Sequence, residues 1–166
     1  MIGDRWNVTE AETRRTYACD ALVPDPALEA WRGVTVAASP AHVWAWVKQI
    51  RLAPYSYDWI DNLGRTSPRE LRDLEDPSVG DPFIACAGRP LGEVLAVEPG
   101  RALTGEIMGA VMSYAVEPAG PGESRLLLKI VMRRYRWAAP AVALGDLVMA
   151  RKQLLTWKEL AERTAG

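Results

Sequence analysis

Histidine, cysteine and phenylalanine are almost missing from this 166-residue chain, which has one His, two Cys and one Phe. His42, Cys19 and Cys86 lie far apart and give no ligand spacing, so we expect no zinc or iron site. The same scarcity disfavours a Ser-His-Asp or Cys-His catalytic centre and a disulfide framework. Glycine-rich phosphate-binding motifs are also missing. We therefore expect neither a metal nor a cofactor.

An excess of charge of one sign is missing too. The formal net charge is -1, which disfavours nucleic acid or an anionic membrane as a partner. The longest mainly apolar stretch, residues 137–144, is far shorter than the roughly 20 residues of a membrane span, and the N-terminus lacks a signal-peptide pattern. We expect one cytoplasmic domain, monomeric or homodimeric, without membrane insertion.

Seven tryptophans are present, and they suit a core or the wall of an apolar pocket. Short apolar runs separated by Pro- and Gly-containing turns predict strands at 31–37, 83–87, 92–98, 102–108, 111–117 and 124–136. In the last run, Leu126, Leu128, Ile130 and Met132 alternate onto one face. The short turns favour an antiparallel meander.

Two short helices are expected after the first strand. Ser39 and Pro40 begin the first, which continues to about Ile50, and the second covers 55–63 and ends at Gly64. A long amphipathic helix is expected from Pro140 to about Arg163. Its predicted apolar arc comprises Ala143, Leu144, Leu147, Val148, Ala150, Leu154, Leu155 and Ala161; Arg151 and Lys158 fall inside it, and Gln153 falls opposite.

These elements predict an α+β helix-grip fold. A curved antiparallel sheet of about six to seven strands wraps around the long C-terminal helix, and the two short helices follow the first strand. Residues 31–166 would form this domain, and residues 1–30 would be an N-terminal arm packed on it. A gap between sheet and helix is the natural place for a pocket.

Several segments resemble the START-like superfamily, which includes pollen-allergen-type proteins and polyketide cyclases. The resemblance is carried by residues 38–47 (ASPAHVWAWV), 92–103 and 124–126. Residues 5–7, 55–63, 79–81 and 145–151 are similar to a bacterial subgroup of that superfamily. In that subgroup a Gly-rich turn commonly precedes the Tyr-Ser-Tyr-Asp stretch. Residues 50–54 (IRLAP) stand here instead, so the pocket mouth near Tyr55 is expected to differ.

The stretch with the most candidate ligand-binding or catalytic side chains contains Tyr55, Tyr57, Asp58 and Trp59. Two phenols and a carboxylate could hold a polar group of a ligand or move a proton. Alternatively, Asp58 favours the helix start and the aromatic rings pack. A second set lies at alternating strand positions that could share the inner face: Glu106, Met108, Met112, Tyr114, Met132 and Arg134. Methionines suit an adaptable pocket but also fill ordinary cores.

On the C-terminal helix, Leu147 and Arg151 are the candidates to face the pocket. Arg151 could bind a carboxylate or phenolate group of a ligand, or form a buried ion pair. For Lys158 we expect the side chain to extend to the edge of the apolar surface.

Two functions remain open. One is a non-catalytic module that binds a lipid-like or aromatic, polyketide-like molecule in the cavity. The other is a cyclase, aromatase or dehydratase, as the resemblance implies, in which Glu106, Asp58, Tyr57 and Arg151 converge on the substrate. Binding is favoured over catalysis because the chain offers neither a strong nucleophile nor a catalytic histidine. A third option is a protein-interaction domain with a collapsed pocket, which would show a filled volume and an exposed apolar patch.

Overall fold

The computed structural model describes residues 4–133 and 139–166, and of residues 139–147 only the backbone. The elements follow in the order β1 (Arg5–Trp6), α1 (Glu10–Arg14), α2 (Ala18–Leu22), β2 (Leu28–Val36), α3 (Pro40–Val47), η1 (Lys48–Arg51), α4 (Asp58–Asp61), β3 (Pro82–Cys86), β4 (Arg89–Glu98), β5 (Ala102–Ile107), β6 (Ala110–Gly120), β7 (Glu123–Met132) and α5 (Ala139–Thr164).

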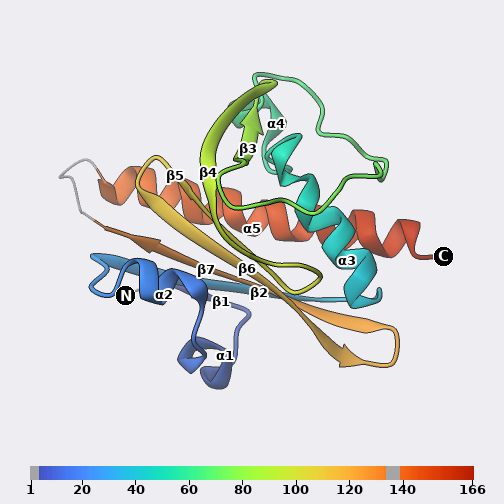
Figure 1. The fold of residues 1–166 in the computed structure, drawn as a ribbon, viewed down its shortest axis with the longest axis horizontal. Coiled ribbons are helices and arrows are strands. Elements are labelled where there is room, and N and C mark those ends of the chain that lie inside the picture. The colour runs from blue at the N-terminus through green and yellow to red at the C-terminus, as the bar shows by residue number, and fades with distance from the viewer. Residues whose placement is uncertain (1–3, 134–138) are drawn as a thin grey trace.

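The strands form one seven-stranded sheet in the order β1-β2-β7-β6-β5-β4-β3. Every neighbouring pair is antiparallel except β1 with β2. The long helix α5 lies along one face of the sheet, and α3 crosses α5 on the same side (Figure 1). This arrangement confirms the predicted helix-grip fold.

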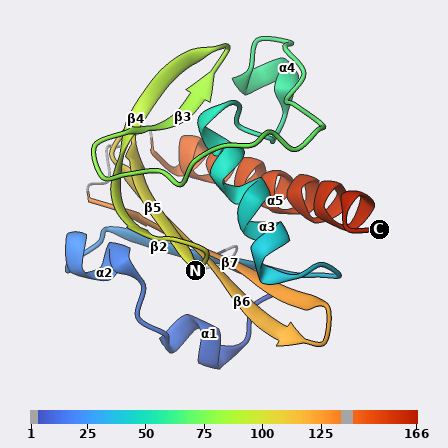
Figure 2. The same ribbon diagram turned by 45° about the vertical axis from the view of Figure 1, so that its right-hand side comes forward.

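α3 and α5 cover one face of the sheet, and α2 packs on part of the other, behind β6 and β7 (Figure 2). We call the side that faces α3 and α5 the inner face; it packs around Trp46, Tyr55, Leu128 and Trp157. On the outer face, α2 and its flanking residues pack with Trp31, Val111, Leu127 and Val131 through Tyr17, Cys19 and Val23. Lys129 pairs there with Asp20 and with Glu29.

Several expected boundaries are wrong; β4, for example, begins at Arg89 instead of residue 92, and β6 continues to Gly120 instead of residue 117. The strand expected from residue 31 begins at Leu28, because Leu28 and Glu29 already pair with Met132 and Val131 of β7. The helix expected over 55–63 is only the single turn α4. Tyr55 has a φ of 55°, in the left-handed region, so the backbone cannot enter a right-handed helix there.

Two tight turns determine which side chains of the neighbouring strands face the site. Ala87–Gly88 joins β3 to β4 and Met108–Gly109 joins β5 to β6, and all four residues have positive φ values of 51–84°. Two consecutive positive φ angles are typical of the two-residue type I′ hairpin. The strand expected to include Met108 therefore ends at Ile107, which pairs with Ala110.

The buried face of α5 differs from the predicted arc. Val148 and Leu155, placed in that arc, are 48% and 37% exposed. Ala150, Leu154 and Ala161 of the predicted arc are buried as expected, and the other described residues that α5 buries are Gln153, Trp157 and Leu160. Trp157, the largest apolar side chain of the helix, takes the sheet-facing position because it removes the most apolar area from water. Ala143, Leu144 and Leu147 lie among the residues whose side chains are not described.

Candidate functional site

A cavity of about 110 Å³ lies between the inner face of the sheet and α5. Three elements wall it: the strands, the middle of α5 and the segment that follows η1. Most of its lining is apolar, and the full set is Pro54, Ser56, Asp61, Ile84, Cys86, Ile107, Ala110, Met112, Tyr114, Ile130, Met149, Ala150 and Gln153. Register explains the strand contributions: Met112 pairs with Ile130, and Ala110 pairs with Ile107, so all four side chains point the same way.

Tyr114 and Gln153 join the sheet to the helix at this cavity. The Tyr114 hydroxyl donates to Gln153 Oε1 at 2.5 Å, and Gln153 Nε2 donates to the Pro54 carbonyl at 2.7 Å. Both side chains are buried. Burial raises the pKa of Tyr114 well above its ordinary value of 10.0, so the phenol keeps its proton and its hydrogen bond at neutral pH.

Asp61, at the end of α4, is the one acidic side chain in the described lining. The Ser56 hydroxyl donates to its Oδ2. Its Oδ1 is buried and has no hydrogen-bond partner among the residues the structure describes. Burial raises the pKa of Asp61 above the ordinary value of 3.8, the Ser56 hydrogen bond opposes this, and the charge of Asp58 adds to it.

An open hollow adjoins the cavity. Asp61 and Cys86 line both spaces, and Leu63, Arg65, Ala87 and Arg89 line the hollow alone. Asn62 holds this region together, because its Oδ1 accepts from the Ala87 N–H at 2.8 Å and its Nδ2 donates to the Arg65 carbonyl at 2.5 Å. Burial raises the pKa of the Cys86 thiol, and the Asp61 charge adds to this, which keeps the sulfur protonated and weakly nucleophilic.

The Tyr-Ser-Tyr-Asp-Trp stretch does not converge on this cavity as a unit. Tyr55 is buried in the core between the Trp46 and Trp157 rings, accepts from Gln49 Nε2 at 2.7 Å, and has a pKa raised to about 12 by burial. Asp58 instead holds Ser67, accepting from its hydroxyl at 2.5 Å and its N–H at 2.8 Å. Trp59 is 74% exposed. Tyr57, half-buried, precedes α4 and does not line the cavity.

The strand residues expected on the inner face do not all lie there. Met112 and Tyr114 line the cavity as expected. Glu106 does not share their face: it pairs with Val111, an outer-face residue, and forms an ion pair with Arg133 at 3.5 Å. The expectation for Glu106 is wrong because Leu103, Gly105 and Ile107 take the inward positions of β5.

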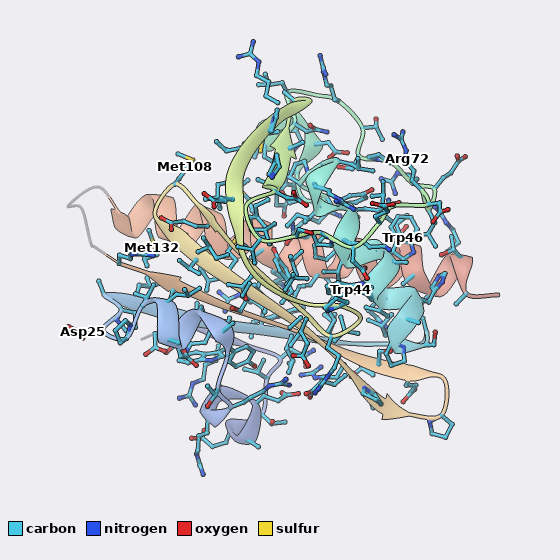
Figure 3. The ribbon with its side chains drawn as sticks, in the orientation of Figure 1. Asp25, Trp44, Trp46, Arg72, Met108 and Met132 are labelled. Carbon is cyan, nitrogen blue, oxygen red and sulfur yellow. The ribbon has the colours of Figure 1, made fainter. Side chains whose placement is uncertain are left out.

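Met108 and Met132 have different places (Figure 3). Met108, in the β5–β6 turn, is 86% exposed, so it was wrongly expected on the inner face. Met132 lies at the end of β7 and packs against the inner core without lining the cavity. Arg134 and the side chain of Leu147 lie outside the described part of the structure.

Arg151 does not face the cavity. Its guanidinium lies 4.7 Å from the centroid of the Trp6 ring, and the residue is exposed. Lys158 reaches the edge of the helix, where it donates to the Thr35 carbonyl at 2.8 Å and pairs with Glu162. Neither cation therefore lies on the buried face of α5, which carries Trp157 and Gln153.

Sequence reasoning named none of the lining residues Ser56, Asp61, Cys86 and Gln153, and of the apolar lining it named Met112 alone. For Gln153 a signal exists: Ala150, Leu154, Trp157 and Ala161 share its face at helical spacing. For Asp61 no signal exists, since nothing in the sequence of residues 55–63 distinguishes it from Asp58. Among the residues that the structure describes, no three His, Cys, Asp or Glu side chains gather as a metal site, and no helix is long and apolar enough to cross a membrane.

Neither a protein-family model nor a curated protein matches this chain. Solved structures do. A structural-genomics protein from Mesorhizobium loti is 21% identical with a TM-score of 0.55, and the match covers 82% of this chain and 98% of that protein. One from Rhodobacter sphaeroides is 18% identical with a TM-score of 0.56, covering 85% and 96%.

Ara h 8.0201, a protein of the Bet v 1 pollen-allergen type, has 10% identity and a TM-score of 0.56, and the match covers 82% of this chain and 99% of that one. At these identities the similarities show the fold alone. They agree with the helix-grip architecture derived from the strand order and the position of α5.

Proposed function

We propose that this protein binds a small, largely apolar molecule in the cavity between the sheet and α5. The observation that carries this proposal is the cavity itself, about 110 Å³ lined mainly by apolar side chains with a few polar groups. A concave apolar space with few, separate polar groups is the usual composition of a small-molecule site.

Cavity size limits the ligand class. The volume is of the order of an engineered protein cavity of about 150 Å³ that stays dry and binds benzene. It is smaller than the roughly 300 Å³ at which pockets for drug-sized ligands begin. We therefore favour one aromatic ring, or a short aliphatic chain, as the part of the ligand that the cavity itself holds; the hollow beside Asp61 and Cys86 leaves room for a larger molecule to extend outward. Met112 and Met149 line the cavity and can adjust their rotamers to different shapes.

No specific observation favours the cyclase-type enzyme built on the residues proposed from sequence. Glu106 is on the outer face, Asp58 is bonded to Ser67, and Arg151 stacks on Trp6. A proton-transfer mechanism that needs these groups around one substrate has no geometric basis in this arrangement. Binding is the function that the remaining groups support.

Titration with ethylbenzene, followed by heteronuclear NMR, tests the proposal. We expect saturable shifts of Met112, Ile130 and Met149 methyl signals. Ala110→Leu should abolish them because the added side chain fills the space, while Ala41→Leu on the exposed side of α3 should leave binding unchanged. Native mass spectrometry of the purified protein would also detect a co-purified ligand. The proposal is wrong if ethylbenzene does not bind, or if a folded Ala110→Leu variant binds it like the wild type.

A further inference from the structure

Asp61 is a polar group that the described part of the fold leaves half satisfied. Oδ2 receives the Ser56 hydroxyl, whereas Oδ1 is buried without a partner. A buried acceptor without a hydrogen bond destabilises the folded state, because it loses its hydrogen bonds to water and gains none in the protein. Asp61 also lines the cavity, so a small displacement of this carboxyl would bring Oδ1 within reach of a molecule bound inside.

The position of Asp61 places it between two spaces. It lines the cavity, whose other walls are mainly apolar, and it also lines the open hollow beside Arg65 and Arg89. A ligand whose body fills the cavity would meet Asp61 at its outer end. One polar group at the end of an apolar space selects molecules that carry one complementary group at one end.

The charge of the site decides which group that is. Asp61 is an acceptor, and its Oδ1 is shielded from water, so its attraction for a positive donor is weakly screened. Arg65 and Arg89 carry the opposite charge but are exposed on the side of the hollow, where water screens them. The shielded carboxyl therefore dominates recognition inside the cavity, and the exposed arginines do not make it an anion site.

We propose that Asp61 is the recognition group of the cavity, and that the ligand is a small apolar molecule bearing one protonated amine, which donates to Oδ1. The apolar part would lie against Met112, Ile130 and Ile84. Ser56 would hold the carboxyl in position through Oδ2. This inference rests on the proposed function, because it assigns the polar end of the same ligand.

Four probes of similar size separate the possibilities: benzylamine, benzyl alcohol, ethylbenzene and benzoate, titrated at pH 7 into wild type and Asp61→Asn. We expect Asp61→Asn to weaken benzylamine by about ten-fold or more, as expected for a lost hydrogen bond between charged groups. Ethylbenzene should change by less than about two-fold, because its binding depends on the apolar walls alone. Glu106→Gln, which removes one carboxyl from the outer face, should leave both affinities unchanged.

The outcomes distinguish this inference from the proposed function. If ethylbenzene binds but benzylamine does not, or if Asp61→Asn weakens both equally, the role of Asp61 is refuted while the cavity stands. Tighter binding of benzoate than of benzylamine, lost in Arg65→Gln, would move recognition to the hollow and also refute it. If none of the four probes binds, both proposals fail. The thermal unfolding midpoint of each variant shows that it is folded.

Discussion

Gly105 lies directly against the ring of Phe83. A Cβ atom added to Gly105 would come within 2.1 Å of the Phe83 side chain, which is fully buried in the inner core. Glycine is therefore required in the middle of β5 for steric reasons, since the ring occupies the space that any side chain would need. This contact fixes β3 against β5 beside the cavity.

Gly105→Ala should accordingly destabilise the protein. We expect a loss of about 1–3 kcal/mol in the free energy of unfolding, the usual range for overpacking a core. Urea unfolding followed by circular dichroism measures it. Gly120→Ala is the matched control, because its added Cβ would have its nearest neighbour at an ordinary 3.6 Å. Equal stability of the two variants would show that Phe83 can move aside without loss.

Asp58 is expected to act on stability and not on ligand binding. Asp58→Ala removes the acceptor of both the Ser67 hydroxyl and the Ser67 N–H, and Ser67 is only 5% exposed. We expect a loss of about 1–3 kcal/mol in unfolding free energy. Asp25→Ala, an exposed carboxyl before β2, should change it by less than about 0.5 kcal/mol. A stable Asp58→Ala variant that no longer binds ethylbenzene would contradict this assignment.

Tyr114 and Gln153 should be energetically coupled. Tyr114→Phe leaves Gln153 Oε1 without its donor, and Gln153→Leu leaves the Tyr114 hydroxyl without its acceptor, so each single change exposes a buried unsatisfied group. In the double variant these two groups are gone together, although the Pro54 carbonyl stays unpaired. We expect the double variant to be about 0.5–2 kcal/mol more stable than the sum of the single losses predicts. Additive losses would mean that the hydrogen bond contributes little.

The pH dependence of stability should report Asp61. Because burial raises its pKa in the folded protein, the folded state binds this proton more tightly than the unfolded chain does. Its contribution is full below the ordinary pKa of 3.8 and is lost as the pH rises through the folded-state pKa. The side chain of the Asp61→Asn variant does not titrate. The stability of this variant relative to wild type should therefore increase as the pH rises from about 4 to about 7.

Ser56→Ala provides the opposite change for this experiment. The Ser56 hydrogen bond lowers the pKa of Asp61, so its removal should raise that pKa further and make the loss of stability with pH steeper than in wild type. Thermal unfolding midpoints at several pH values measure all three proteins. Parallel curves for wild type and Asp61→Asn would show that Asp61 does not titrate differently in the folded state.

The fold was predictable because the strands carry their own signals. Alternation at Leu126, Leu128, Ile130 and Met132, together with the Pro- and Gly-containing turns, predicts the antiparallel meander of β3 to β7; it does not predict that β2 pairs with β7 or that β1 is a parallel strand. Less of the site was predictable, although Met112 and Tyr114 were found. The face on which a strand residue lies depends on the register of its strand. The Met108–Gly109 turn removes Met108 from β5. Leu103 and Ile107 take the inward positions of β5, so Glu106 points to the outer face.

The remaining errors come from the assumption that a polar residue is exposed to solvent. Gln153 was placed opposite the buried face because it is polar, but Tyr114 and the Pro54 carbonyl satisfy its amide in the core. Asp61 gave no sequence signal because its importance arises from burial beside Ser56 and Cys86. Contacts between distant segments determine such burial, and the local pattern does not contain them.

The packing behind the sheet has a mechanical consequence for the cavity. Tyr17, Cys19 and Val23 pack behind β6 and β7, two of the strands whose inner side chains line it. The opposite wall includes Pro54, Ser56 and Asp61 from the segment between η1 and β3, whose regular structure is the single turn α4. Side-chain hydrogen bonds hold that segment, from Gln153 to the Pro54 carbonyl and from the Ala87 N–H to Asn62. Any selectivity for the shape of a ligand then depends on these few hydrogen bonds, because they position that wall.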